Sequence, residues 1–197
     1  MGIPLGILGL AVYGATVRGF DPARLFRDPV SAGSLPIYTG LISSLGVVLW
    51  VATAGICLFA YSLVRTRAGQ AEGARFLLAI GLLTALLGLD DLLLFHEQIA
   101  PRLLRIPELM VMVGYATFLG GIFIRFRRVL LDSADELLAG ALMGLGGSVA
   151  FDVLAPPGGM YPVAEDGLKF LGIALWSTFH VRVAFRLLQP NSSHDFG

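Results

Sequence analysis

The stretch FLLAIGLLTALLGLDDLLLFHE, residues 76–97, combines a long apolar run with a cluster of ionisable side chains. Residues 76–89 carry no charge, whereas two aspartates, a histidine and a glutamate follow within residues 90–97. Roughly 20 mainly apolar residues form a helix that can cross a bilayer. A charge near the bilayer centre costs about 2.5–3.5 kcal/mol on insertion scales, so such residues usually serve a function. The stretch therefore predicts a transmembrane helix that ends in a polar site.

The composition of the whole chain also favours a membrane protein. Of its 197 residues, 56% are hydrophobic and 14% are charged, whereas a soluble domain has about 25% charged residues. The formal net charge is zero, and a chain without a basic surface is not expected to bind nucleic acid. The single cysteine, Cys57, cannot form a disulfide within the chain. We expect one transmembrane domain over residues 1–197.

Six apolar stretches are candidates for membrane helices. They cover residues 3–17, 41–64, 76–95, 109–124, 137–154 and 163–181. The first is short for a span and is either a first helix or a re-entrant or interfacial segment. The sequence thus predicts an all-α fold, a polytopic transmembrane bundle of five or six helices. Residues 18–39 are expected to form an outer loop with a short interfacial helix around residues 22–26, and residues 189–197 a flexible tail.

The arginines of the connecting segments predict the orientation of the chain. If consecutive helices alternate in direction, one side of the membrane holds Arg65, Arg67, Arg75, Arg125, Arg127, Arg128, Arg182 and Arg186. The other side holds Arg18, Arg24, Arg27, Arg102 and Arg105. Because positive loops stay in the cytoplasm, we expect the first side, with the C-terminus, to be cytoplasmic. The expected location is the plasma membrane of a bacterium, which in a bacterium with two membranes is the inner membrane.

The same alternation gathers acidic residues at the outer ends of the helices. Half of the fourteen acidic side chains belong to this group. They are Asp90, Asp91, Glu97, Glu108, Asp152, Glu165 and Asp166, together with His96 and the only lysine, Lys169. Lys169 is the available counter-charge at this depth, so we expect it to pair with Asp90, Asp91 or Asp152.

Helix geometry predicts how deep each of these groups lies. On a straight helix Asp90 is about 10 Å deeper than Glu97, so the two cannot bind one ion directly. We expect a deep layer of Asp90, Asp152 and Lys169 and a shallow layer of His96, Glu97 and Glu165. His180 follows Glu165 by about 22 Å along the same helix and is expected to lie outside the site.

Three interpretations of the polar cluster remain open. The acids at Glu108, Glu165 and Asp166 suit the positive N-terminal ends of helices, and a buried ion pair could simply lock the helices together. A proton or ion path is the second interpretation, although polar residues are few in the inner half of the bundle. The third is a metal site, because carboxylates with one histidine suit iron, manganese, magnesium or zinc.

The metal interpretation assigns a role to each residue. Asp90, His96, Glu97, Asp152 and Glu165 are the expected ligands of a divalent ion, and Asp90, His96 and Glu97 are also the expected catalytic groups. Asp91, Asp166 and Lys169 are expected to support the ligands from behind. The chain has no Glu-x-x-His pair of the kind found in bundle-type dinuclear sites.

These features favour a small membrane enzyme with an outward-facing acidic pocket. Its substrate is expected to be lipidic or amphipathic, and its reaction a metal-dependent hydrolysis or an oxidation. The alternative is a non-catalytic accessory subunit of a larger membrane complex. The expected partners are membrane lipid and either other membrane subunits or a second copy of the chain. Gly140 and Gly144, at small-xxx-small spacing, predict close packing of the helix that contains them.

Overall fold

The computed structural model describes residues 2–19, 21, 25–26, 33–36, 38–131, 133, 136–154 and 161–189. All regular secondary structure in these ranges is helical, so the all-α prediction is confirmed. The chain divides into two compact units, Met1–Leu41 and Ile42–Gly197. Apart from Gln189, the predicted tail lies outside the described residues.

The first unit contains helix α1 (Gly2–Val17), which has 16 residues. At about 1.5 Å per residue it is about 24 Å long, which is shorter than the hydrocarbon core of about 30 Å. The helix ends before Gly19, whose φ of 73° suits a residue without a side chain. Leu25 and Phe26 form a 3₁₀ turn, and the rest of the helix expected around residues 22–26 lies outside the described residues. That α1 crosses the membrane stays a prediction.

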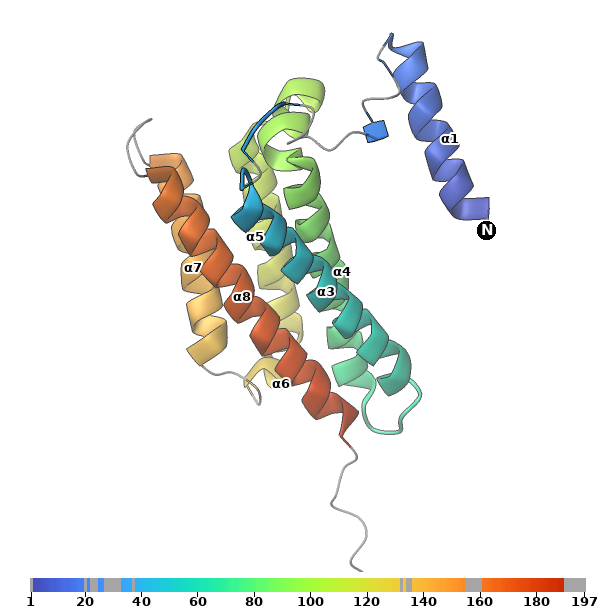
Figure 1. Ribbon diagram of the computed structural model, residues 1–197. Coiled ribbons are helices and arrows are strands. Elements are labelled where there is room, and N and C mark those ends of the chain that lie inside the picture. Colours follow the sequence, from blue (N-terminus) through green and yellow to red (C-terminus); the bar gives the residue numbers. More distant parts are fainter. Residues whose placement is uncertain are drawn as a thin grey trace, which may run out of the picture. The chain divides into compact units, whose positions relative to one another are not determined.

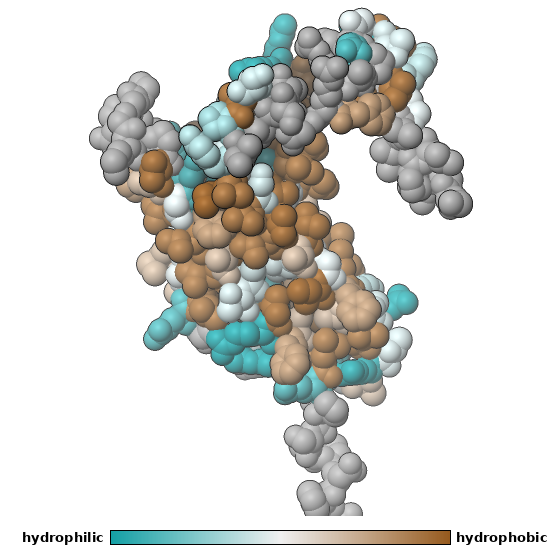
Figure 2. All heavy atoms as spheres, in the orientation of Figure 1, coloured by the Kyte–Doolittle hydropathy of each residue, from teal (hydrophilic) through white to brown (hydrophobic). Residues whose placement is uncertain are grey.

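The second unit is a helical bundle (Figure 1). Its elements are α3 (Leu41–Val64), α4 (Ala71–Leu93), η2 (Phe95–Leu104), α5 (Glu108–Arg125), α6 (Arg127–Leu131), α7 (Glu136–Leu154) and α8 (Tyr161–Leu188). Four described segments are long and apolar enough to cross a membrane, namely Leu41–Val64, Ala71–Leu93, Glu108–Arg125 and Val163–Leu188. Figure 2 shows apolar residues over the middle of the bundle and hydrophilic residues near the end with the α3–α4 connection. These properties fit a membrane protein, and the number of five or six crossings stays a prediction.

Contacts between arginines and their partners show which helix ends lie together. In the α3–α4 connection, Arg67 donates from Nη1 to the carbonyl oxygen of Leu188 at the end of α8, over 2.7 Å. At the end of α5, Arg125 lies 3.5 Å from the carboxylate of Glu72 in the first turn of α4. The end of α4 and the beginnings of α5 and α8 therefore lie at the opposite end of the bundle. This agrees with the alternating directions assumed from the sequence.

Helices α7 and α8 approach each other backbone to backbone. A Cβ atom added to Gly144 would lie 2.8 Å from the Cα of Gly172, and one added to Gly172 would lie 2.7 Å from the backbone nitrogen of Leu145. A Cβ on Gly140 would lie 2.9 Å from the side chain of Leu175. The close packing predicted from Gly140 and Gly144 is confirmed.

Aromatic side chains fill the core between α3, α4 and α8. The rings of Trp50 and Trp176 meet edge to face with centroids 6.0 Å apart. His180 is fully buried beside Trp176 and Phe76, and its Nδ1 lies 2.9 Å from the carbonyl oxygen of Trp176. It does not line the polar cavity described below, in agreement with the sequence-based expectation.

Candidate functional site

The polar site begins where α4 stops. Leu94 adopts a left-handed conformation, with φ 51° and ψ 43°, and its N–H donates to the carbonyl oxygen of Asp90. The chain then continues as the wider π-type helix η2, whose end is marked by a second left-handed residue, Arg105. The prediction of one straight helix over residues 76–95 was therefore wrong at its C-terminal end, because the backbone changes direction at Leu94.

The change of direction returns His96 to Asp90. His96 Nδ1 forms a short ion pair with Asp90 Oδ2, and the backbone N–H of His96 donates to Asp90 Oδ1 over 3.1 Å. The Tyr115 hydroxyl on α5 donates to the same oxygen over 2.8 Å. Both oxygens of the buried Asp90 carboxylate are thus engaged, as a buried charge requires. The expected division into deep and shallow layers does not apply to His96, because it contacts Asp90 directly.

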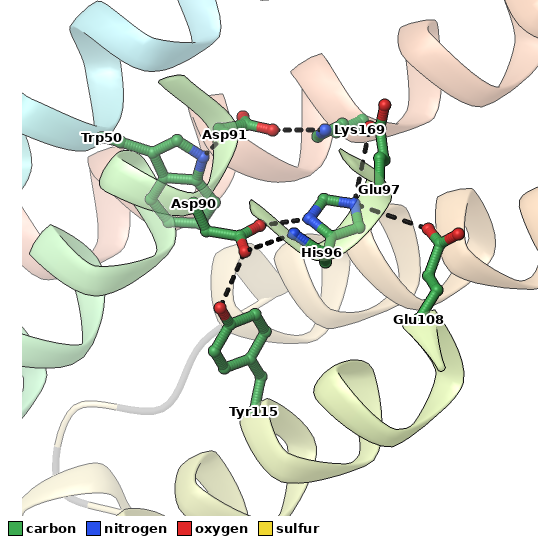
Figure 3. A network of polar contacts seen from close by, with 8 residues as sticks. All are labelled: Trp50, Asp90, Asp91, His96, Glu97, Glu108, Tyr115 and Lys169. Carbon is green, nitrogen blue, oxygen red and sulfur yellow. Dashed lines mark hydrogen bonds and ion pairs between the residues drawn. The ribbon is translucent and has the colours of Figure 1, made fainter. Parts of the chain in front are cut away.

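The second ring nitrogen of His96 faces two further carboxylates (Figure 3). Its Nε2 lies 3.5 Å from Glu97 Oε1 and 3.8 Å from Glu108 Oε1. The ring is buried, whereas the Glu97 and Glu108 side chains are 40% and 37% exposed. One nitrogen is therefore held in the interior, and the other is directed toward groups with access to solvent.

The surroundings of His96 alter its proton affinity. Burial by itself lowers the pKa of His96, but the hydrogen bond and charge of Asp90 and the charge of Glu97 outweigh that effect, while Lys169 opposes them. The net result is a pKa above the usual value of 6.5. The imidazole thus favours its charged form over a wider pH range than a free histidine does.

The lone lysine pairs with Asp91. Lys169 Nζ forms a short ion pair with Asp91 Oδ1, and the Trp50 indole N–H donates to Asp91 Oδ2 over 3.2 Å. Trp50 reaches this position because Gly88 lies against it, where a Cβ would be 2.8 Å from the Trp50 Cβ. The prediction that Lys169 pairs with one of three aspartates is confirmed, and the structure selects Asp91.

The eight predicted site residues and Glu108 all line one cavity of about 760 Å³. We call its carboxylates the acidic end of the cavity: Asp90, Asp91, Glu97, Glu108, Asp152, Glu165 and Asp166. His96 and Lys169 are the cations that face them, and apolar side chains of α4, α5 and α7 line the remainder. Residues far apart in the sequence are thus brought together at one end of the bundle.

The expected metal ligands do not all surround a single point. Asp90 is engaged by His96 and Tyr115, and Asp152 interacts with Glu108 and Glu165. Within the described ranges, no group of three or more His, Cys, Asp or Glu side chains is arranged to hold a metal ion. The roles of the five residues as ligands stay predictions.

Sequence reasoning missed Tyr115 and assigned Glu108 only to a helix terminus. Tyr115 lies in an apolar stretch, and its sequence neighbours do not indicate that it belongs to a polar site. Its distance of seven residues from Glu108 places both on one face of α5, and this spacing is the signal that could have linked them. Tyr115 adds a second hydrogen bond to Asp90 Oδ1, beside the one donated by the backbone N–H of His96.

Comparison with protein families gives a match over nearly the whole chain. Residues 2–183 match the model of a family described as a domain of unknown function, DUF8692. The chain belongs to this family. No curated protein and no solved structure matches the chain. Membership in DUF8692 carries no assigned activity, so the function has to be argued from the cavity.

Proposed function

We propose that this DUF8692 protein is an integral membrane enzyme whose acidic cavity holds a divalent cation beside His96. The chain would cross the membrane five or six times, with its C-terminus in the cytoplasm and the cavity open to the outside. Four long apolar helices and the excess of arginine at the opposite end of the bundle support this arrangement. The substrate would be lipidic or amphipathic, because a cavity at the end of a membrane bundle is accessible from the lipid boundary.

The observation that carries the proposal is the orientation of His96. A histidine that binds a metal through one nitrogen usually gives the other to a carboxylate, which fixes its tautomer and direction. Asp90 occupies Nδ1 in this way, and Nε2 faces Glu97 and Glu108. We therefore place Asp90 behind the ligand, not among the ligands as the sequence suggested.

The partly exposed carboxylates complete the proposed ligand set. Glu97 and Glu108 need a small movement toward His96 Nε2, and their exposure leaves room for it. Asp152 and Glu165 face them from α7 and α8 as further ligands or as bases. One nitrogen with several carboxylate oxygens suits iron, manganese or magnesium, and zinc less well.

The reaction would be hydrolysis or oxidation. A bound divalent ion supplies an activated water or an electrophilic centre for hydrolysis, and iron would also permit oxidation. In the hydrolytic case Glu165 or Asp152 would act as the general base. A carboxylate that lines the cavity beside the attacking water can accept its proton. Asp91, Lys169 and Asp166 would hold the walls of the cavity in position.

Metal analysis of the purified protein tests the proposal directly. We expect about one divalent ion per chain, lost in His96→Ala and in Glu108→Gln. The control is Glu72→Gln, which removes a carboxylate at the opposite end of the bundle and should leave the metal in place. A protein without metal after reconstitution with each of the four ions would contradict the proposal.

Turnover is measured separately. The metal-loaded protein in nanodiscs is incubated with amphipathic esters and with unsaturated lipids, and products are detected by mass spectrometry. Product formation that requires both the metal and His96 supports an enzyme. A protein that holds the metal but converts no member of either class speaks for a different role.

The exposure of α5 favours one alternative role, that of a non-catalytic subunit in a larger membrane complex. Ile122 is the single buried residue of this helix, and only 6% of its apolar window is covered within the chain. Lipid or another membrane protein must cover the rest. Co-purification with a partner at fixed stoichiometry, lost on substitution of Met110 or Val113 by arginine, would support the subunit role.

A further inference from the structure

The lining of the cavity limits what kind of molecule can occupy it. Resting on the proposed function, we propose that the cavity binds an amphiphile with a cationic head group, the head at the acidic end and the tail in the apolar remainder. Three independent features of the cavity lead to this substrate class: its charge, the gradient of polarity along its walls and the hydroxyl group of one largely buried serine.

The charge of the acidic end disfavours an anionic head group. Lys169 is paired with Asp91, and His96 is paired with Asp90. Five carboxylates remain, and two of them, Glu97 and Glu108, face His96 Nε2. Within the described part of the chain, the other three form no salt bridge; they are Asp152, Glu165 and Asp166. A divalent cation offsets two negative charges, so the acidic end stays negative when loaded. A phosphate or sulfate would be repelled there, whereas an amine or quaternary ammonium group would be attracted.

The carboxylates on α7 and α8 lie close enough to one another to repel. Glu165 is repelled by Asp152 and Asp166 and attracted by Lys169, which is already paired with Asp91. No described arginine lines this part of the cavity. One lysine therefore serves several carboxylates, and a cationic group of the ligand would supply a further positive charge for them.

Polarity changes in the same direction along three walls of the cavity. Each helix contributes apolar side chains deeper in the bundle and a carboxylate nearer its end. The pairs are Leu83 and Leu87 with Asp90 on α4, Leu119 and Met112 with Glu108 on α5, and Leu142 and Leu145 with Asp152 on α7. From Leu83 to Asp90 the distance along the helix is about 10 Å. A ligand that matches all three walls has a polar head and an apolar tail.

Ser148 points to a polar atom between the head and the tail. Its side chain lines the cavity, is only 6% exposed and forms no hydrogen bond with any residue that the structure describes. It lies one helical turn deeper than Asp152 on the same face of α7. Its hydroxyl is therefore free to donate to a ligand in the cavity, and an ester or amide group next to the head of the ligand would accept that hydrogen bond.

Binding of short-chain probes to the metal-free protein tests this inference. The protein is placed in nanodiscs with a chelator, and calorimetry measures its affinity for octyltrimethylammonium, octyl sulfate, tetramethylammonium and octanoylcholine, with empty nanodiscs as the blank. We expect octyltrimethylammonium to bind at least about tenfold more tightly than octyl sulfate or tetramethylammonium. Equal affinity for the cationic and anionic chains, or for tetramethylammonium and the octyl cation, would overturn the proposal.

Variants locate the binding inside the cavity. The double variant Asp152→Asn with Glu165→Gln should weaken octyltrimethylammonium about tenfold, whereas Glu72→Gln should not. Ser148→Ala should weaken octanoylcholine, which has an ester beside its head, and leave octyltrimethylammonium unchanged. Unchanged binding in the double variant would place the probes elsewhere and reject the inference. Because the protein is metal-free, loss of the metal proposal would leave these results intact, and the reverse also holds.

Discussion

At the scale of single residues, the site is organised by two ion pairs that share neighbouring positions on α4. Asp90 holds His96, and Asp91 holds Lys169. Adjacent residues on a helix point in different directions, so Asp90 contacts η2 and α5 whereas Asp91 contacts α3 and α8. The sequence identified all four residues but could not assign the partner of Lys169. Three aspartates were expected at a similar depth in the membrane, and depth alone does not distinguish them.

The pair of Lys169 and Asp91 predicts an asymmetric response to substitution. Lys169→Met should destabilise the protein by about 3–5 kcal/mol, because it leaves a buried carboxylate without its counter-charge. Adding Asp91→Asn should restore most of this, since the asparagine still accepts a hydrogen bond from Trp50. Adding Asp91→Leu should restore less, because it leaves the indole N–H unpaired. Thermal unfolding in detergent gives the order, and rescue by Asp90→Asn instead would disprove the pairing.

The raised pKa of His96 predicts how stability depends on pH. A group whose pKa is higher in the folded protein stabilises it fully below the unfolded value, here 6.5, and this stabilisation is lost as pH rises through the folded value. With a chelator present, the melting temperature of the wild type should therefore fall above pH 6.5 more than that of His96→Gln. Parallel curves would show that His96 gains no proton affinity on folding. Added metal should reverse the trend, because metal binding requires neutral Nε2.

At the scale of elements, the break between α4 and η2 and the contact between α7 and α8 decide the shape of the cavity. The length of the apolar run predicted the helix that α4 forms, but it did not predict where that helix ends. No glycine or proline precedes Pro101 in this region, and Leu94 takes a left-handed conformation that an L-residue adopts at a cost of about 1–2 kcal/mol. Such strain persists only where surrounding contacts compensate for it, and here the contacts of Asp90 with His96 do so.

Substitution at Leu94 tests the strained turn. Leu94→Gly should be close to neutral, because relief of the left-handed strain is offset by the greater freedom of glycine in the unfolded chain, about 0.5–1 kcal/mol. Leu94→Val should destabilise by about 1–2 kcal/mol, because a β-branched residue tolerates this conformation poorly. Leu94 is 43% exposed, so lost packing contributes little to either change. A valine variant as stable as the glycine variant would argue against a left-handed residue here.

The contact between Gly144 and Gly172 predicts strong intolerance of larger side chains. Gly144→Leu should destabilise by about 1–3 kcal/mol or prevent folding, because its Cβ would lie 2.8 Å from the Gly172 backbone. Gly121→Ala on α5 is the matched control, since no atom lies within 4 Å of the added Cβ. The measurement is the yield of monodisperse protein in detergent together with its melting temperature. Equal behaviour of the two variants would contradict close packing of α7 on α8.

At the scale of the whole molecule, the two ends of the bundle have different chemistry. Arginines and their partners connect the α3–α4 loop, α5 and α8 at one end, and the acidic end of the cavity lies at the other. The positive end is expected in the cytoplasm. This asymmetry predicts both the orientation of the chain and the side from which a substrate arrives.

Cysteine labelling of intact cells tests the orientation. Single cysteines at Arg67 and Arg127 should be protected from an impermeant reagent, and a cysteine at Leu103, which is 68% exposed, should react. The native Cys57 is buried and should not contribute. Reaction at all three positions, or at none of them, would disprove the alternating arrangement on which the site depends.

The sequence by itself determined the all-α class, the apolar helices and the set of acidic residues that meet at one end. These properties follow from length, hydropathy and the alternating direction of successive helices, all of which can be read along the chain. The tertiary structure decided that His96 contacts Asp90, that Lys169 selects Asp91 and that Tyr115 belongs to the site. The physical reason is that these choices depend on a left-handed turn at Leu94 and on close approaches at Gly88. The turn at Leu94 contains no glycine, and Gly88 and Trp50 lie on different helices. Whether such a turn and such a contact form depends on how the whole bundle packs, and local sequence patterns do not predict it.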